Sequence, residues 1–169
     1  LLTNRRKHMI KFIITAAMAA AVIAVPAQAK SPKSMKCAVV SQANVEGLFT
    51  DFNKAWATKD PATVTKLFTK DAVLLATVSN KPRLNHEEIK DYFVSFLKGS
   101  PVGTIDSSTF KMGCNTAARM GTWTVSLTNL NSGDRNDVKA RYTFIYRIED
   151  GKWKIDHLHS SMMPESTGK

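Results

Sequence analysis

The hydrophobic period of the sequence changes near residue 104, and this change constrains the fold more than any other feature. Before it, apolar residues recur every three or four positions, as they do on the buried face of a helix. After it, apolar and polar residues alternate in segments joined by short turns, as in antiparallel strands. Helices that precede strands in this way predict an α+β fold, in which helices cover one face of a curved antiparallel sheet.

Three helices are predicted in the first half of the chain. Ser41, Asp60 and Asn85 are the expected N-caps, because each carries a side-chain oxygen and precedes a segment of helical periodicity. Residues 70–79 form a dense apolar run that is too short for a helix and predicts a strand. Further strands are predicted within 104–113, 115–130, 137–149 and 153–163.

The first 29 residues have the composition of a secretory signal peptide. A basic segment precedes an apolar segment, and Ala-Gln-Ala at 27–29 matches a cleavage site. Met9 is the expected start, and a retained membrane anchor is the alternative to cleavage. The sequence therefore predicts an exported protein, periplasmic or secreted, with no membrane contact after cleavage. The expected division is a signal peptide over 1–29, a flexible leader over 30–37, one α+β domain over 38–165 and a tail over 166–169.

The charge of the chain gives no sign of a nucleic-acid partner. Signal cleavage would remove four of the 24 basic residues and none of the 14 acidic ones, so the net charge would fall from +10 to +6. The remaining Lys and Arg residues are spread along the chain, whereas a nucleic-acid-binding surface gathers them on one face.

Two cysteines, Cys37 and Cys114, make up the whole cysteine content of the chain. In an exported protein they meet an oxidising compartment, which favours one intramolecular disulfide. Two free thiols and a crosslink between chains are the alternatives.

The last predicted strand carries two of the four histidines, His157 and His159, next to Ser160. Strict alternation places both imidazoles on the face that begins with Trp153 and Ile155. Because that face is the more apolar one, we expect both histidines on the helix-covered side of the sheet, near its polar end.

Several roles are open to the two histidines. As acid–base groups in a partly apolar pocket they could act with Asp71, and Tyr92 is a second candidate partner. A metal site lacks a third ligand at a recognisable spacing, and nothing around Ser160 resembles a nucleophile elbow. The alternative is that the histidines only satisfy hydrogen bonds near the sheet edge or an oligomer interface. No cofactor is predicted, because the sequence has no dinucleotide fingerprint.

Arg141 and Trp123 complete the candidate ligand-binding set. Arg141 alternates with Tyr142, which predicts that it points outward, although a curved sheet could turn it toward a cavity where it would hold a carboxylate. Trp123 is predicted in the core.

Four segments of the chain resemble one known family. They are 150–165 (DGKWKIDHLHSSMMPE), 140–146 (ARYTFIY), 113–117 (GCNTA) and 79–93, which contains SNKPR and EEIKDYF. On these motifs, residues 38–165 resemble the nuclear-transport-factor-like superfamily, also called cystatin-like or SnoaL-like. Within it, the chain is most similar to the association domain of calcium/calmodulin-dependent protein kinase II and its secreted bacterial relatives.

The resemblance implies a cone, in which three N-terminal helices lie on the concave face of a strongly curved antiparallel sheet around a pocket. It also implies a homodimer formed through the sheet, or a larger assembly. In the kinase association domain arginines line this pocket and hold a small carboxylate, but Trp123, Phe144 and Ser160 stand at those places here.

The sequence and the resemblance together lead to one main interpretation, an exported oligomeric domain that binds an unidentified small molecule in a conical pocket. One alternative is an isomerase, lyase or hydrolase with a histidine acid–base group. The other is a purely structural oligomerisation module.

Overall fold

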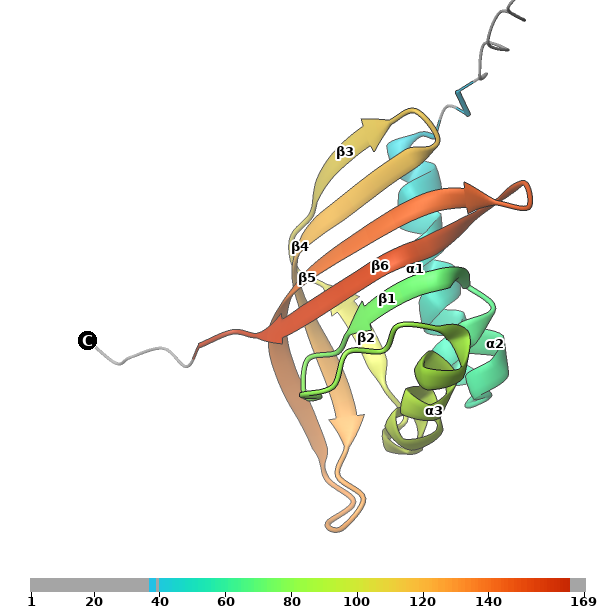
Figure 1. The fold of residues 1–169 in the computed structure, drawn as a ribbon. Coiled ribbons are helices and arrows are strands. Elements are labelled where there is room, and N and C mark those ends of the chain that lie inside the picture. Colours follow the sequence, from blue (N-terminus) through green and yellow to red (C-terminus); the bar gives the residue numbers. More distant parts are fainter. Residues whose placement is uncertain (1–36, 39, 165–169) are drawn as a thin grey trace, which may run out of the picture. The chain divides into compact units, whose positions relative to one another are not determined.

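The computed structural model describes residues 37, 38 and 40–164, and Figure 1 shows their elements in sequence colours. The predicted signal peptide, most of the predicted leader and the predicted tail lie outside the described residues. Within 40–164, the helices precede most of the sheet, as predicted. No helix in this part of the chain is long and apolar enough to cross a membrane.

Each of the three α-helices begins directly after its predicted N-cap. The side-chain oxygens of Ser41, Asp60 and Asn85 accept hydrogen bonds from backbone N–H groups of the first turn, which would otherwise lack partners. A short 3₁₀-helix, η1 (Leu97–Gly99), follows the last of them. The helices are α1 (Gln42–Ala57), α2 (Pro61–Thr65) and α3 (His86–Phe96).

Six strands form one curved sheet, and the three helices lie on the inner side of its curve (Figure 1). The strand order is β1-β6-β5-β4-β2, with β3 also paired to β4. All pairs are antiparallel except β1–β6, which is parallel, and the predicted strand at 104–113 is divided into β2 and β3. The strands are β1 (Phe68–Leu75), β2 (Val102–Ile105), β3 (Thr109–Gly113), β4 (Thr116–Thr128), β5 (Arg135–Glu149) and β6 (Lys152–Met162).

The core lies between the helices and the concave face of the sheet. Tyr142, Phe144 and Tyr146 alternate along β5 and are almost fully buried there, as the period of two predicts. From α1, the ring of Phe52 packs edge-on to Phe144 with 5.5 Å between centroids, and Phe49 makes a similar contact at 6.1 Å. These offset and edge-on aromatic contacts add to the burial of apolar area. The amphipathic face of α1 is therefore what holds the helices on the sheet.

A β-bulge interrupts β6 at Asp156. Ile155 pairs with Tyr146, but the next residue of β5, Ile145, pairs with His157, so Asp156 has no opposite residue. One extra residue inverts the side-chain direction of everything that follows. After the bulge, Leu158 and Ser160 point inward and are buried, which leaves His157 and His159 on the convex face. The predicted placement of both histidines on the helix-covered side is therefore wrong.

The boundary between β2 and β3 lies opposite Gly121 on β4. The N–H groups of Asp106 and Ser107 both donate to the carbonyl oxygen of Thr122, at 2.9 and 3.1 Å. This turn brings the Ser107 carbonyl group so close to Gly121 that a Cβ there would overlap it. A residue without a side chain is thus required at position 121.

The predicted disulfide between Cys37 and Cys114 is present. It joins the residues before α1 to the β3–β4 turn, where the backbone N–H of Ala38 also donates to Asn115 Oδ1 at 2.7 Å. The bridge closes a separation of 77 residues. Cross-links over long loops restrict the unfolded chain most, so this bridge should contribute substantially to stability.

Candidate functional site

A narrow cavity lies between α3, the end of α1 and the concave face of the sheet. The volume that is open to the centre of a water molecule is about 40 Å³, which is room for a few water molecules. A larger occupant would have to displace side chains at its mouth. The mouth is formed by Val78, Tyr92 and Phe96. These three residues line both the cavity and a groove on the outside of α3. The largest apolar side chains that line the cavity are Trp56, Leu74, Phe93, Phe96, Trp123, Leu127 and Leu158.

Three polar side chains in the cavity form a connected group. The indole Nε1 of Trp123 donates to Ser160 Oγ at 3.1 Å, and the hydroxyls of Thr77 and Ser160 are 2.5 Å apart. Ser160 comes from β6, where it is the second inward-facing residue after the bulge, and Thr77 follows β1. The parallel pairing of β1 with β6 is what brings these two hydroxyls together.

Trp56 adds a second indole to the same cavity. Its ring centroid is 6.0 Å from that of Trp123, and both residues are only 2% exposed. Unlike Trp123, Trp56 has a buried Nε1 with no hydrogen-bond partner among the described residues. A buried donor without a partner costs free energy. This donor is therefore a candidate contact for a bound molecule.

Tyr92 lies on α3 at the mouth of the cavity. Burial raises the pKa of its hydroxyl well above the ordinary value, so the side chain is neutral at physiological pH. The guanidinium of Arg83 lies over its ring at 5.7 Å from the centroid, and the same group donates to the carbonyl oxygen of Lys81 at 2.7 Å. Tyr92 can thus offer a neutral hydroxyl, and Arg83 is engaged outside the cavity.

The histidines lie on the other side of the sheet from this cavity. His157 is half-buried and His159 is exposed, beside Ile145 and Thr143 of β5. Burial lowers the pKa of His157 below the ordinary value, and the neighbouring His159 lowers it further. Neither imidazole lines the cavity. The two histidines therefore cannot act as acid–base groups on a molecule bound there.

Arg141 also lies on the convex face, where one Nη donates to the carbonyl oxygen of Met162 at 3.3 Å. A groove there is lined by Arg141, Tyr142, Thr143, His159 and Ser161. The outward position predicted for this arginine agrees with the structure, and Arg141 does not reach the cavity that Trp123 and Tyr92 line.

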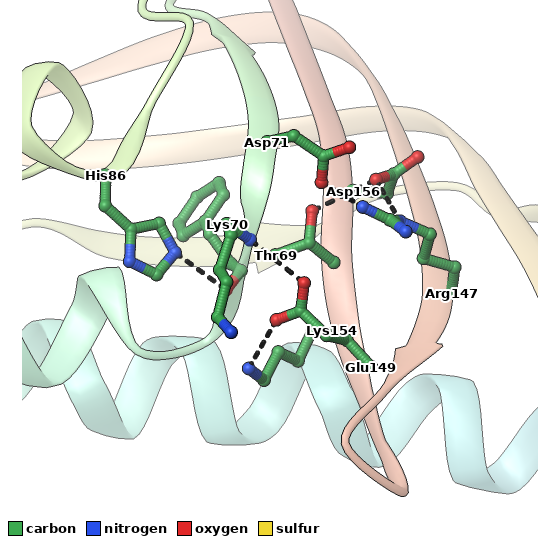
Figure 2. A network of polar contacts seen from close by, with 9 residues as sticks. Thr69, Lys70, Asp71, His86, Arg147, Glu149, Lys154 and Asp156 are labelled. Atoms are coloured by element: carbon green, nitrogen blue, oxygen red, sulfur yellow. Dashed lines mark hydrogen bonds and ion pairs between the residues drawn. The ribbon is translucent and has the colours of Figure 1, made fainter.

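Asp71 belongs to a polar network at the start of β1, which Figure 2 shows from close by. It pairs with Arg147 of β5, whose Nε donates to Asp156 Oδ1 at 2.5 Å. Asp156 also accepts a hydrogen bond from Thr69 at 3.0 Å. The bulged residue thus connects β1 to β5, and Asp71 is brought to neither histidine nor Tyr92.

The rest of this network also ties β1 to its neighbours. Glu149 pairs with Lys154 at 2.7 Å and accepts from the backbone N–H of Lys70 at 3.2 Å (Figure 2). The hydrogen bond from Lys154 holds the pKa of Glu149 below its usual range. His86 lies 3.0 Å from the carbonyl oxygen of Phe68. These contacts join β1, the β5–β6 hairpin and α3, which is a structural role.

Some cavity residues could not be recognised from the sequence. Trp56 lies on the apolar face of α1, where the sequence pattern predicts that every large side chain packs in the core. Thr77 lies outside any regular element. Ser160 did have a signal: apolar residues at 153, 155 and 158 are spaced two and then three apart, which marks an extra residue in the strand.

Residues 41–164 match the model of the calcium/calmodulin dependent protein kinase II association domain family. The chain belongs to this family. A candidate association domain of this kind from Xanthomonas campestris is 42% identical, with a TM-score of 0.70, over 76% of this chain and 95% of that one. A comparison with curated proteins gave no match.

More distant solved structures share the fold of this association domain. A nuclear transport factor 2-like protein from Salmonella enterica is 15% identical, with a TM-score of 0.64 over 75% of this chain and 92% of that one. A candidate scytalone dehydratase from Novosphingobium aromaticivorans is 11% identical, with a TM-score of 0.63 over 71% and 82%. The cystatin-like, nuclear-transport-factor-like fold predicted from the sequence is thus confirmed.

At three positions, Trp123, Phe144 and Ser160, the association-domain resemblance implies pocket arginines that this chain lacks. Trp123 and Ser160 line the cavity and hydrogen-bond to each other, and Phe144 is fully buried. The side chains at these positions are therefore inward-facing, but they offer no cation to a carboxylate.

Proposed function

We propose that this association domain is an exported protein that binds a small, largely apolar molecule in the cavity between α3 and the sheet. The observation that carries the proposal is the lining of the cavity. Two indoles and several aliphatic and aromatic side chains surround a small group of hydroxyls, which is the composition of a ligand site.

Binding is favoured over acid–base catalysis by the same lining. Tyr92 is the one titratable side chain among the residues that line the cavity, and its raised pKa keeps it protonated. The histidines that could transfer protons near neutral pH lie on the convex face. The dehydratase description of the Novosphingobium neighbour, at 11% identity, supports the fold and not this reaction.

A purely structural module is the other alternative. Such a module has no need of the cavity, whose lining includes Trp56, with its buried and unpartnered indole N–H, and the hydroxyls of Thr77 and Ser160. Unpaired buried donors reduce stability, so these features support a site for a ligand.

Thermal unfolding with and without toluene, a small apolar probe, tests the binding proposal. Binding to the folded state alone raises the melting temperature. Ala76→Leu should abolish this rise, because Ala76 lines the narrow cavity. Ala57→Leu is the matched control, since Ala57 is exposed at the end of α1 and away from the cavity. The proposal fails if toluene does not stabilise the parent chain, or if it stabilises the Ala76→Leu variant equally.

Self-association through the convex face is the second part of the proposal. Ile145, which is 36% exposed there, lies beside the half-buried His157 on the outer side of the β5–β6 pair. Membership of an association-domain family supports a second copy of the chain as the partner. Light scattering at micromolar concentration should give a dimer or a larger assembly. Ile145→Asp should yield a monomer, whereas Val94→Asp on the exposed side of α3 should not.

Export is supported by the disulfide and by the signal-like composition of residues 1–29. N-terminal sequencing of the protein from a periplasmic or culture fraction should begin at Lys30. Recovery of the chain with residues 1–29 intact in the cytoplasm would contradict it.

A further inference from the structure

The connected side chains of Trp123, Ser160 and Thr77 have one more hydrogen-bond donor than their own hydrogen bonds use. The indole of Trp123 can only donate, so Ser160 Oγ must accept from it at 3.1 Å. The hydroxyl of Thr77 also donates to Ser160 Oγ. The hydrogen of the Ser160 hydroxyl is therefore left over. The group therefore has one O–H that is free to bond to an occupant of the cavity.

Trp56 supplies a second unused donor to the lining of the same cavity. Its Nε1–H is buried and has no partner among the described residues. Its ring lies next to that of Trp123, which carries the bonded indole N–H. An acceptor on a bound molecule would remove the cost of this unpaired donor.

The cavity offers no charge to balance a charged ligand. Among its lining residues there is no Lys, Arg, His, Asp or Glu side chain. The nearby guanidinium of Arg83 is held outside by Tyr92 and by the carbonyl oxygen of Lys81. An ionised carboxylate or amine that entered would lose its hydration without gaining a counter-ion, which is strongly unfavourable.

From these observations, and resting on the proposed binding function, we infer the chemical class of the ligand. The cavity selects an uncharged molecule with an apolar body and at least one acceptor oxygen, as in a ketone, an aldehyde or an ester. The oxygen takes the free hydroxyl hydrogen and the Trp56 Nε1–H, and the body lies against the aromatic lining.

Three ring compounds of similar shape separate these requirements. Cyclohexanone has the acceptor oxygen, methylenecyclohexane has a carbon in its place, and cyclohexanecarboxylate is an anion at neutral pH. The readout is the set of indole N–H resonances in the nitrogen–proton correlation spectrum, assigned by single Trp→Phe variants. The chain has three tryptophans, of which Trp56 and Trp123 line the cavity and Trp153 does not.

Cyclohexanone should move the Trp56 resonance downfield and leave that of Trp153 in place. Methylenecyclohexane should perturb the two cavity indoles without that downfield shift, and the carboxylate should perturb neither. Trp56→Phe should weaken cyclohexanone binding about fivefold more than methylenecyclohexane binding, which is the worth of one hydrogen bond. Thr77→Val is the matched control, because Ser160 only accepts from Thr77 and keeps its own hydrogen free in the variant; it should change the binding of neither compound.

Two results would overturn the inferred ligand class but not the proposed binding function. One is a carboxylate that binds as tightly as the ketone, and the other is the same indole shift with ketone and alkene. If neither uncharged compound moves either cavity indole, the proposed binding function falls as well.

Discussion

The two cavity tryptophans allow a direct measurement of what an unpaired indole costs. Trp56 and Trp123 are equally buried, at 2% exposure, and Trp→Phe deletes the same atoms at both positions. The transfer and cavity contributions should therefore nearly cancel in the comparison. What differs is the hydrogen bond, which Trp123 donates to Ser160 and Trp56 lacks.

The size of the difference follows from these contacts. Trp123→Phe loses a hydrogen bond worth about 1 kcal/mol, whereas Trp56→Phe removes an unpaired buried donor whose cost is about 1–3 kcal/mol. Trp123→Phe should therefore be about 2–4 kcal/mol more destabilising than Trp56→Phe. For a domain of this size, 1 kcal/mol corresponds to about 3–4 °C in melting temperature, so the two variants should differ by at least about 6 °C.

Urea unfolding followed by circular dichroism gives both free energies of unfolding by linear extrapolation. Equal m-values for the two variants are the control that their unfolded states are comparable. Equal losses of stability, or a greater loss for Trp56→Phe, would refute the reasoning. Such a result would mean that Trp56 Nε1 is already paired in solution, and the free donor assigned to the ligand would not exist.

Other parts of the fold give equally specific expectations. Gly121→Ala should destabilise strongly, because its Cβ would overlap the Ser107 carbonyl group. Gly47→Ala should stabilise by about 0.5–1 kcal/mol, because Gly47 has open space around it in the middle of α1. Denaturant midpoints that move in the same direction for both variants would contradict this. Reduction of the disulfide should lower the free energy of unfolding by up to about 4–5 kcal/mol, and thiol titration of the unfolded, unreduced chain should find no free thiol. The folded-state pKa of His157 is lowered, so its contribution to stability is complete above the unfolded value of about 6.5 and is lost as the pH falls through the folded pKa. His157→Gln should remove that part of the acid sensitivity, and an unchanged dependence of stability on pH would count against the burial of this imidazole. His159→Gln should raise the pKa of His157 in an NMR titration.

Local signals in the sequence predicted the elements well because each has a local cause. The caps at Ser41, Asp60 and Asn85 depend on a side chain and on the few residues that follow it. The pairing of Cys37 with Cys114 needed only the compartment and the count of cysteines. The inward face of β5 followed from a period of two that nothing interrupts.

The candidate site was harder to predict because it depends on register and on contacts between distant segments. One extra residue, Asp156, transferred His157 and His159 from the predicted inner face to the outer one. The hydroxyl pair of Thr77 and Ser160 exists only because β1 runs parallel to β6, a pairing that no local pattern encodes. Tyr92 and Trp123 were found at the cavity, since both lie on inward faces of long, regular elements.

The parallel pairing of β1 with β6 also determines when this chain can fold. The strand at 68–75 finds its sheet neighbour only among the last residues described, around 155–159. The aromatic face of α1 and the inner side of β1 therefore lack their full cover until residues 155–159 are available to pair with β1. Such distant pairings slow folding and leave apolar surface open to aggregation in the meantime. Loss of even the final strand would remove an internal member of the sheet, and a C-terminal truncation should behave as an unfolded chain.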